Sequence, residues 1–243
     1  MKATLEVDDH HWWYRGRRRI IRAELDRLPL PAQARVLDAG CGSGRTLQEL
    51  ADYGDPIGIE LDQDAAQLAR GRGIGEVVTG RLEELPWPAN SFDLITCLDV
   101  LEHTPDDRVT LGELRRVCEP GGFTLVTVPA YQALWSLHDE ANHHYRRYSK
   151  RALRAAAVDS GWAVMRISSF NSLLLAPAAV VRLTQRHLGP HNGYTNDLEL
   201  GPEWLNDALE QPLRAEAGWL GRGHTLPAGL SVLAVLRRPW TDA

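Results

Sequence analysis

The sequence predicts an α/β protein whose core is a doubly wound, parallel sheet. From residue 35 onward, short apolar runs alternate with helical patterns, which is the order that strand–helix–strand units produce. At residues 36–52 an apolar strand runs into three alternating glycines and then into a helix. The chain has 243 residues, 44% of them apolar, which is enough to bury one sizeable core. We therefore expect a single α/β domain with appended elements.

The alternation predicts strands separated by helices. The strands are expected, in chain order, at residues 35–37, 57–59, 77–79, 93–98, 123–128, 162–167 and 230–236. The helices between them are expected at residues 45–52, 64–70, 106–118 and 150–160. Gly71, the run Pro120-Gly121-Gly122 and Gly161 end three of these helices, and Ser149 is a good N-cap for the last.

Two stretches lie outside this alternation. Residues 1–28 predict a basic, aromatic amphipathic helix before the first strand, with five arginines that we expect to face solvent: Arg15, Arg17, Arg18, Arg19 and Arg22. Residues 170–224 predict an insertion before the last strand, with helices at residues 172–187 and 202–219. Each stretch is expected to form either a lid over the site or a dimer surface. The sequence therefore leaves open whether the protein forms a homodimer.

Composition excludes several classes of protein. The net charge of −5 argues against a general nucleic-acid binder, which usually has a strongly basic face. Cys41, Cys97 and Cys118 fit neither a disulfide framework nor a zinc pair, which favours a reducing cytoplasm. The N-terminal residues lack the apolar run of a signal peptide, and the longest apolar stretch, at residues 173–181, is about half of the roughly 20 residues that a membrane span needs. We expect a cytoplasmic protein without stable membrane insertion.

The glycine-rich segment at residues 36–44 is the sharpest signal of function. Glycines are needed where the backbone turns tightly and approaches a ligand without a Cβ in the way. Arg45 and Leu47 stand where a dinucleotide fingerprint would need its third glycine, counted from Gly40 and Gly42 respectively. The pattern Asp-x-Gly-x-Gly-x-Gly instead suits a ligand without phosphate whose charged end is an amino acid. A tight turn with no ligand is the alternative.

An acidic residue follows the second strand at the spacing of a ribose ligand. Glu60 closes that strand roughly 20 residues after the loop, where a carboxylate can accept hydrogen bonds from both ribose hydroxyls. Isolated acids at strand ends are often only solvated. Here the spacing from Gly44 favours a nucleoside ligand.

With these residues the chain resembles the class I methyltransferases that depend on S-adenosylmethionine (SAM), in particular the small-molecule branch similar to the ubiquinone and menaquinone methyltransferases. The resemblance covers about 40% of the chain and rests on segments in the family's order: residues 36–44, 57–60, 84–88 with 91–95, 99–103 and 114–122. It implies a Rossmann-like, doubly wound, seven-stranded and mostly parallel sheet with its last strand antiparallel. It also implies an N-terminal lid helix at residues 1–28, followed by the SAM-binding domain at residues 29–243 with its insertion at residues 170–224.

The resemblance implies an enzyme that transfers a methyl group from SAM to a small, largely hydrophobic metabolite by in-line displacement. It assigns the methionyl part of SAM to Asp38, Gly40, Gly42 and Gly44, with Leu98, Asp99 and His103 beside it. It assigns the ribose to Glu60 and the adenine to Leu61 and the backbone of Leu82.

The sequence departs from the family at the adenine site. Many relatives carry an acid before the position of Leu82, but this chain has Arg81, whose guanidinium cannot accept a hydrogen bond. Glu83 or the backbone would then bind the adenine amino group. Arg81 also leaves open a SAM-binding protein with degraded catalysis.

The acceptor is expected to bind near the loop at residues 131–148, which exceeds the usual connection length. We expect His144 to act as the general base, with Asp139 or Glu140 orienting it, and His103 is either a second base or a structural histidine. Acceptor-binding candidates are Trp13, Tyr14, Trp135, Tyr145, Arg146 and Arg147.

Two alternatives remain for this loop. A metal site with His138, Asp139, His143 and His144 as ligands is conceivable, but the spacing matches no recognised pattern, so we expect no metal. The acceptor could also be an isoprenoid lipid or RNA. The fourth strand ends in Cys97-Leu98-Asp99, without the Asn/Asp-Pro-Pro-aromatic motif used on exocyclic base amines, which favours a small molecule.

Overall fold

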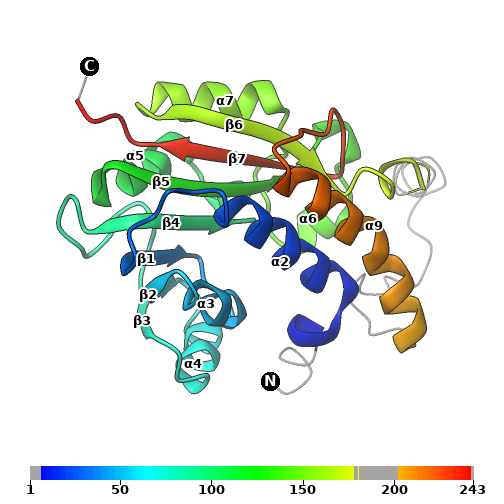
Figure 1. Cartoon of the computed structure of the whole chain (residues 1–243), viewed down its shortest axis with the longest axis horizontal. Coiled ribbons are helices and arrows are strands. Elements are labelled where there is room, and N and C mark those ends of the chain that lie inside the picture. Colours follow the sequence, from blue (N-terminus) through cyan, green and yellow to red (C-terminus); the bar gives the residue numbers. More distant parts are fainter. Residues whose placement is uncertain (1–6, 178–179, 181–201, 242–243) are drawn as a thin grey trace.

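The computed structural model describes residues 7–177, 180 and 202–241 (Figure 1). Its centre is a seven-stranded sheet in the order β3-β2-β1-β4-β5-β7-β6. The strands are β1 (Ala34–Ala39), β2 (Gly54–Glu60), β3 (Glu76–Thr79), β4 (Phe92–Leu98), β5 (Cys118–Pro129), β6 (Ala163–Phe170) and β7 (Ser231–Arg237). The first five strands pair in parallel, and β7 runs antiparallel to both β5 and β6. This arrangement confirms the predicted fold class.

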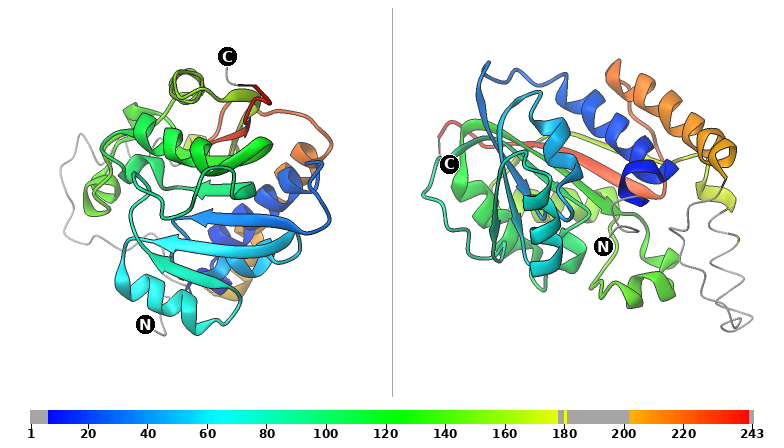
Figure 2. Two further views of the ribbon diagram at one scale, coloured as in Figure 1. Left: turned by 90° about the vertical axis from the view of Figure 1, so that its left-hand side faces the viewer. Right: turned by 90° about the horizontal axis from the view of Figure 1, so that it is seen from below.

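Helices cover both faces of the sheet (Figure 2). On one face lie α2 (Trp12–Leu25), α3 (Arg45–Leu50) and α9 (Glu203–Gly221); on the other lie α5 (Asp107–Val117) and α7 (Lys150–Asp159). Among the described residues, α4 (Gln63–Gly71) is a further helix, which packs against β2 and β3. None of the helices in the described part of the chain is long and apolar enough to cross a membrane.

The two layers of helices, one on each face of the sheet, follow from the alternation of side chains along each strand. Val36 belongs to the cluster that contains Ile21 of α2, whereas its neighbour Leu37 belongs to the cluster that contains Leu114 of α5. Successive strand residues point to opposite faces, so a strand of continuous apolar residues is buried on both sides. The apolar runs at residues 35–37, 93–98 and 123–128 therefore correspond to central strands, whereas those at residues 77–79 and 162–167 form the edge strands β3 and β6.

The N-terminal segment differs from the single helix predicted for residues 1–28. Residues 7–10 are helical, and α2 then begins anew at Trp12. His11 interrupts the helix because its backbone is extended, with φ −67° and ψ 133°, and its imidazole accepts a hydrogen bond from the backbone of Trp13. An N-cap in this conformation ends one helix and starts another.

The arginines of α2 do not all face solvent, which corrects the prediction. Arg18 is buried and pairs with Glu49 of α3 at 3.0 Å. Arg15 and Arg19 both pair with Glu210, whose side chain is buried on α9. Helices α2 and α9 lie side by side in Figure 2, joined by the ion pairs to Glu210 as well as by apolar packing.

The insertion is described in part. The predicted helix at residues 202–219 is α9, which starts after Pro202 and continues to Gly221. The predicted helix at residues 172–187 lies largely outside the described residues. Glu216 of α9 accepts hydrogen bonds from the backbone of Asn171 and Ser172, and so fixes the chain where it leaves β6.

The fifth strand begins earlier than predicted. It includes the run Pro120-Gly121-Gly122, which was expected to precede it. Gly121 has φ 83° and donates its backbone N–H to Arg238, and the register against β4 shifts between Phe92 and Leu94. A bulge of this kind lets a strand tolerate proline and glycine.

Candidate active site

The glycine loop after β1 leaves open space beside its backbone. Gly40, Gly42 and Gly44 all have positive φ, at 81°, 55° and 78°. A Cβ on Gly40 would lie 2.5 Å from Val100, and one on Gly44 would lie 2.8 Å from Ala69. A Cβ on Gly42 would meet nothing within 4 Å. Gly42 is thus the point at which a ligand can approach the loop.

Glu60 lies directly against this loop. One carboxylate oxygen accepts a hydrogen bond from the backbone of Gly42 at 2.8 Å, and the other accepts one from Asp62 at 2.9 Å. The neighbouring Leu61 is 59% exposed. The carboxylate and an apolar side chain thereby stand at one side of the open space.

Asp38 supplies a buried carboxylate at the other side. Its Oδ1 accepts a hydrogen bond from the Thr96 hydroxyl at 2.7 Å, whereas its Oδ2 is buried and has no hydrogen-bond partner within the described residues. Burial raises the pKa of Asp38 to about 6, although the Thr96 hydrogen bond and the charge of Arg17 oppose the rise. An unpartnered carboxylate oxygen beside the loop fits a cationic amino group such as that of the methionyl end of SAM.

Arg17 closes the site from α2. Its guanidinium donates to the carboxylate of Asp99, which follows β4 with φ 57° and also accepts from the Thr127 hydroxyl at 3.1 Å. The guanidinium carbon lies 5.7 Å from the ring centre of Tyr14. Burial raises the pKa of Tyr14, and the charge of Arg17 opposes this rise. Sequence reasoning missed Arg17; its signal was the i, i+3 spacing from Tyr14 on a predicted helix.

The short helical segment before α2, at residues 7–10, lies on the glycine loop. Asp8 contacts the hydroxyl of Ser43 in the loop, and Asp9 pairs with Arg45 at 3.0 Å. Arg72 donates to the Ser43 carbonyl at 2.9 Å and to Asp9 at 3.4 Å. The N-terminal segment is therefore held against the loop by several polar contacts.

The residues predicted for the adenine lie at the rim of the sheet. Leu82 is buried, as is Leu98, which was assigned to the methionyl end. Arg81 is exposed and its guanidinium lies 3.6 Å from the carboxylate of Glu83. The acid that we expected to replace the family's adenine contact therefore has Arg81 as a partner.

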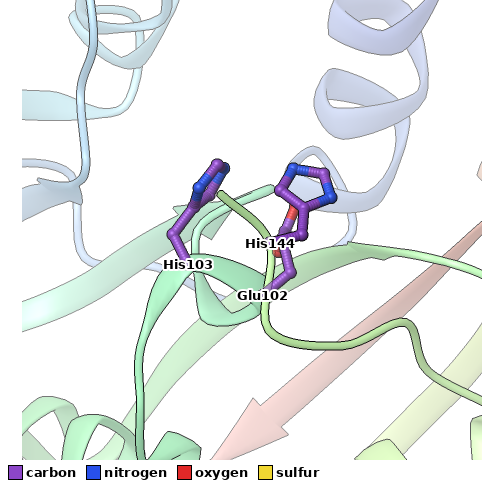
Figure 3. A group of neighbouring side chains, drawn as sticks. All are labelled: Glu102, His103 and His144. Atoms are coloured by element: carbon purple, nitrogen blue, oxygen red, sulfur yellow. The ribbon is translucent and has the colours of Figure 1, made fainter. Parts of the chain in front are cut away.

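The loop at residues 131–148 is ordered by two short helices, η2 (Gln132–Leu134) and α6 (Leu137–Ala141). The backbone of Tyr145 donates to the Glu102 carbonyl at 2.7 Å, which ties the loop to the turn η1 (Leu101–His103) after β4. As a result the rings of His103 and His144 lie edge to face, with their centres 4.5 Å apart (Figure 3).

A carboxyl group lies beneath these two imidazoles. Glu102 is buried, and its Oε2 has no hydrogen-bond partner within the described residues. Burial, and then the charge of Asp99, raise the pKa of Glu102 well above its usual range. Burial, and then His144, lower the pKa of His103, which favours its neutral form.

The candidate metal ligands differ from those considered in the sequence. Among the described residues, the ligand atoms that lie within 4.8 Å of one another belong to Glu102, His103 and His144 (Figure 3). Only His144 is shared with the alternative set.

Asp139 forms a buried ion pair instead. It is fully buried and accepts hydrogen bonds from His144 Nδ1 at 2.9 Å and from Arg147 at 2.7 and 2.9 Å. Burial alone would raise the pKa of Asp139, but the hydrogen bonds from His144 and Arg147 outweigh it and hold this pKa well below its usual range. Of the two carboxylates considered for orienting His144, Asp139 is the one in contact. Arg147, predicted to bind the acceptor, is buried with its guanidinium on Asp139 and on the Ala130 carbonyl.

The other predicted acceptor residues divide into two groups. Trp135 is half-buried and Tyr145 is exposed; the guanidinium of Arg146 lies over the Tyr145 ring at 5.8 Å. Trp13 stacks on Phe170 of β6 with ring centres 5.9 Å apart, so it packs in the core beside α9. Its neighbour Tyr14 is the aromatic residue of α2 that lies at the site.

Comparison with known proteins agrees with this geometry. Residues 37–126 match the family model described as a methyltransferase domain. The ubiquinone biosynthesis O-methyltransferase of Xanthomonas oryzae pv. oryzae is 34% identical over 149 residues, which are 54% of this chain and 62% of that protein. The protein of the same name from Hahella chejuensis is 29% identical over 197 residues, 68% of this chain and 82% of that protein. The chain thus spans less than two thirds of the length of the Xanthomonas relative.

A solved methyltransferase from Haloferax volcanii, in complex with the Trm112 methyltransferase activator, has the same fold. Its TM-score is 0.64 at 21% identity, over 100% of this chain and 95% of that one. The fold, the glycine loop and the sequence matches make this chain similar to the class I SAM-dependent methyltransferases, a class whose cofactor is SAM. Within that class, the chain is similar to the ubiquinone biosynthesis O-methyltransferases.

Proposed function

We propose that this chain transfers the methyl group of SAM to a small, largely hydrophobic metabolite by in-line displacement. The observation that carries the proposal is the position of Asp99. Its charge acts on Glu102 and His103, and Arg17 binds its carboxylate from α2. The next residue, Val100, packs against Gly40 of the glycine loop. A donor at the loop and an acceptor at the imidazoles would then be neighbours, as an in-line transfer requires.

The cofactor site is proposed from the residues around the loop. Asp38 would bind the methionyl amino group through its free Oδ2, Leu98 and Asp99 would flank that end, and Glu60 would exchange its backbone partners for the ribose hydroxyls. Leu61, Leu82 and Glu83 would line the adenine. When bound, SAM supplies a methyl group on a sulfonium, which needs no metal or acid to activate it.

His144 is proposed as the general base. An acceptor hydroxyl must lose its proton during methyl transfer, and a neutral imidazole near the donor accepts it. His103 lies against His144, and burial lowers the pKa of His103, which favours a neutral imidazole beside the proposed base. The names of the relatives support oxygen as the methylated atom. The exposed Tyr145, with the half-buried guanidinium of Arg146 over its ring, suits a polar or anionic end of the acceptor. Arg146 also contacts the Pro105 carbonyl and the carboxylate of Asp107.

The N-terminal segment, predicted at residues 1–28, is proposed as the lid, and its described residues 7–25 support this role. Its contacts from Asp8 to Ser43 and from Arg17 to Asp99 reach both ends of the cofactor site. A lid excludes water and commits the substrate. The remainder of the chain, with the insertion at residues 170–224, is proposed as the SAM-binding domain.

Calorimetric titration with SAM and S-adenosylhomocysteine tests the cofactor proposal first. Wild type should bind both, and Glu60→Ala should weaken binding by about 10-fold or more because two charge-assisted hydrogen bonds are lost. Glu76→Ala, an exposed acid at the far end of β3, is the matched control and should bind like wild type. Absence of binding by wild type would refute the proposal. Binding without S-adenosylhomocysteine release, over a broad panel of hydroxylated acceptors, would favour the second candidate, a SAM-binding protein whose adenine site is altered at Arg81.

A further inference from the structure

We propose that Arg147 is a positioning residue, which holds Asp139 so that His144 keeps its proton on Nδ1 and presents an unprotonated Nε2 to the acceptor. The inference rests on the proposed function, because it concerns the residue proposed there as the base. It gives Arg147 a role through His144 in place of the acceptor contact predicted from the sequence.

The contact between Arg147 and Asp139 is bidentate. Nε donates to Oδ1 at 2.7 Å and Nη2 donates to Oδ2 at 2.9 Å. The remaining terminal nitrogen, Nη1, donates to the Ala130 carbonyl at 3.3 Å. A planar guanidinium that grips both carboxylate oxygens fixes the plane of the carboxylate as well as its position. Both side chains are almost completely buried, at 3% and 0% exposure.

This carboxylate decides the tautomer of His144. The oxygen that accepts from Arg147 Nε also lies 2.9 Å from His144 Nδ1. An ionised carboxylate has no proton to give, so the imidazole must donate from Nδ1. In a neutral imidazole the other nitrogen is then an acceptor. Nε2 is therefore the nitrogen that is free to take a proton from an acceptor.

The position of Asp139 is supported on its remaining side. It is the third residue of α6 and forms a capping box with Ser136, from whose backbone it accepts a hydrogen bond at 2.8 Å and from whose hydroxyl it accepts one at 3.2 Å. The backbone of Arg147 is held by the Gln132 side chain at 2.9 Å. Next to it, Tyr148 pairs with Ala130 at the end of β5. The network is thus anchored to the sheet, which keeps a catalytic group within the narrow range of geometry that it needs.

If this part of the loop served only to fill the core, apolar side chains would do so as well as the buried ion pair of Arg147 and Asp139. A buried ion pair adds little net stability over apolar residues of the same size, because both charges lose their hydration. The ring of His144 lies edge to face with that of His103, and only 8% of the His144 side chain is exposed. The network therefore has its consequence at the imidazole.

The tautomer of His144 can be measured without knowing the acceptor. Long-range ¹H–¹⁵N correlation spectra of histidine-labelled protein distinguish the Nδ1–H from the Nε2–H form, and His144→Gln identifies the signal. At alkaline pH, with EDTA to remove metal ions, wild type should show the Nδ1–H form. In Arg147→Met the signal should shift toward the Nε2–H form that free histidine favours. Arg147→Lys keeps the charge but loses the bidentate contact, and should give a mixture of the two tautomers.

Arg166→Met is the matched control. Arg166 is another largely buried arginine, paired with Glu24 away from the loop, and its loss should leave the His144 signal unchanged. An Nε2–H signal in wild type, or an unchanged Nδ1–H signal in the Arg147 variants, would overturn the proposal. If Arg147→Met does not fold, Arg147→Lys decides alone. SAM titration of wild type and of each variant separates this proposal from the proposed function. If wild type does not bind SAM, the proposed function is refuted, whereas the result on the tautomer of His144 still holds.

Discussion

Arg17 contacts the Asp99 carboxylate, although 82 residues separate them in the sequence. The contact joins α2 to the end of β4, at the junction between the proposed cofactor and acceptor sites. Most of both side chains is shielded, with 13% and 23% exposed. The N-terminal segment is thereby attached to the sheet at its functional edge.

Loss of this contact should destabilise the attachment of α2. Arg17→Met removes a charge-assisted hydrogen bond from a shielded carboxylate, and we expect a loss of about 2 kcal/mol in the free energy of unfolding, measured in urea. Arg22→Met is the control, because its ion pair with Asp52 is exposed and should contribute less than about 1 kcal/mol. Equal effects of the two substitutions would contradict the structural role of Arg17.

The glycine at the centre of the loop should matter more for SAM than for folding. Gly42→Ala meets no neighbouring atom but is strained at φ 55°, at a cost of about 1–2 kcal/mol. Gly73→Ala offers a control with the same two features, φ 66° and open space. We expect similar losses of stability in both variants, and a loss of SAM affinity of about 10-fold or more only in Gly42→Ala, by calorimetry. Unchanged affinity would remove Gly42 from the cofactor site.

The elements of the sheet could be predicted from the sequence because they depend on local patterns. Buried parallel strands are short apolar runs, and residues such as Ser149 and Gly161 mark helix ends by their own chemistry. The interruption at His11 could not be predicted, since histidine is an uncommon N-cap. The contact of Arg17 depends on the rotational phase of α2 on the sheet, which only tertiary packing determines.

The candidate site was predictable to a similar degree. Asp139 and His144 lie five residues apart, so their contact was expected from proximity. Arg147 was predicted to bind the acceptor, because nothing in the sequence shows that the loop folds back and buries its guanidinium on Asp139. The unpartnered carboxyl of Glu102 was missed for the same reason. The roles of all these residues stay predictions.

Asp38 should make stability depend on pH. Its folded pKa of about 6 lies above the ordinary value of 3.8, so the native state binds the proton more tightly than the unfolded state. The free energy of unfolding should therefore fall as pH rises from about 4 to about 6. Asp38→Asn should remove up to about 3 kcal/mol of this dependence, and above pH 6 it should be more stable than wild type. Urea unfolding at pH 4, 5, 6 and 7 measures both quantities. A variant that is equally destabilised at every pH would contradict the assignment.

The proposed base is tested by turnover. His144→Gln keeps a polar side chain but cannot accept and hold a proton, and we expect kcat to fall by about 100-fold or more with SAM affinity retained. The assay is S-adenosylhomocysteine release with the acceptor that a screen of hydroxylated compounds identifies. His143→Asn is the neighbouring control, since His143 is exposed with φ 54°, a backbone conformation that asparagine tolerates. If His144→Gln turns over normally while His103→Gln does not, the base is His103. Normal turnover by both variants would mean that positioning alone supplies the rate, because methyl transfer to a nucleophile that is already deprotonated needs no base.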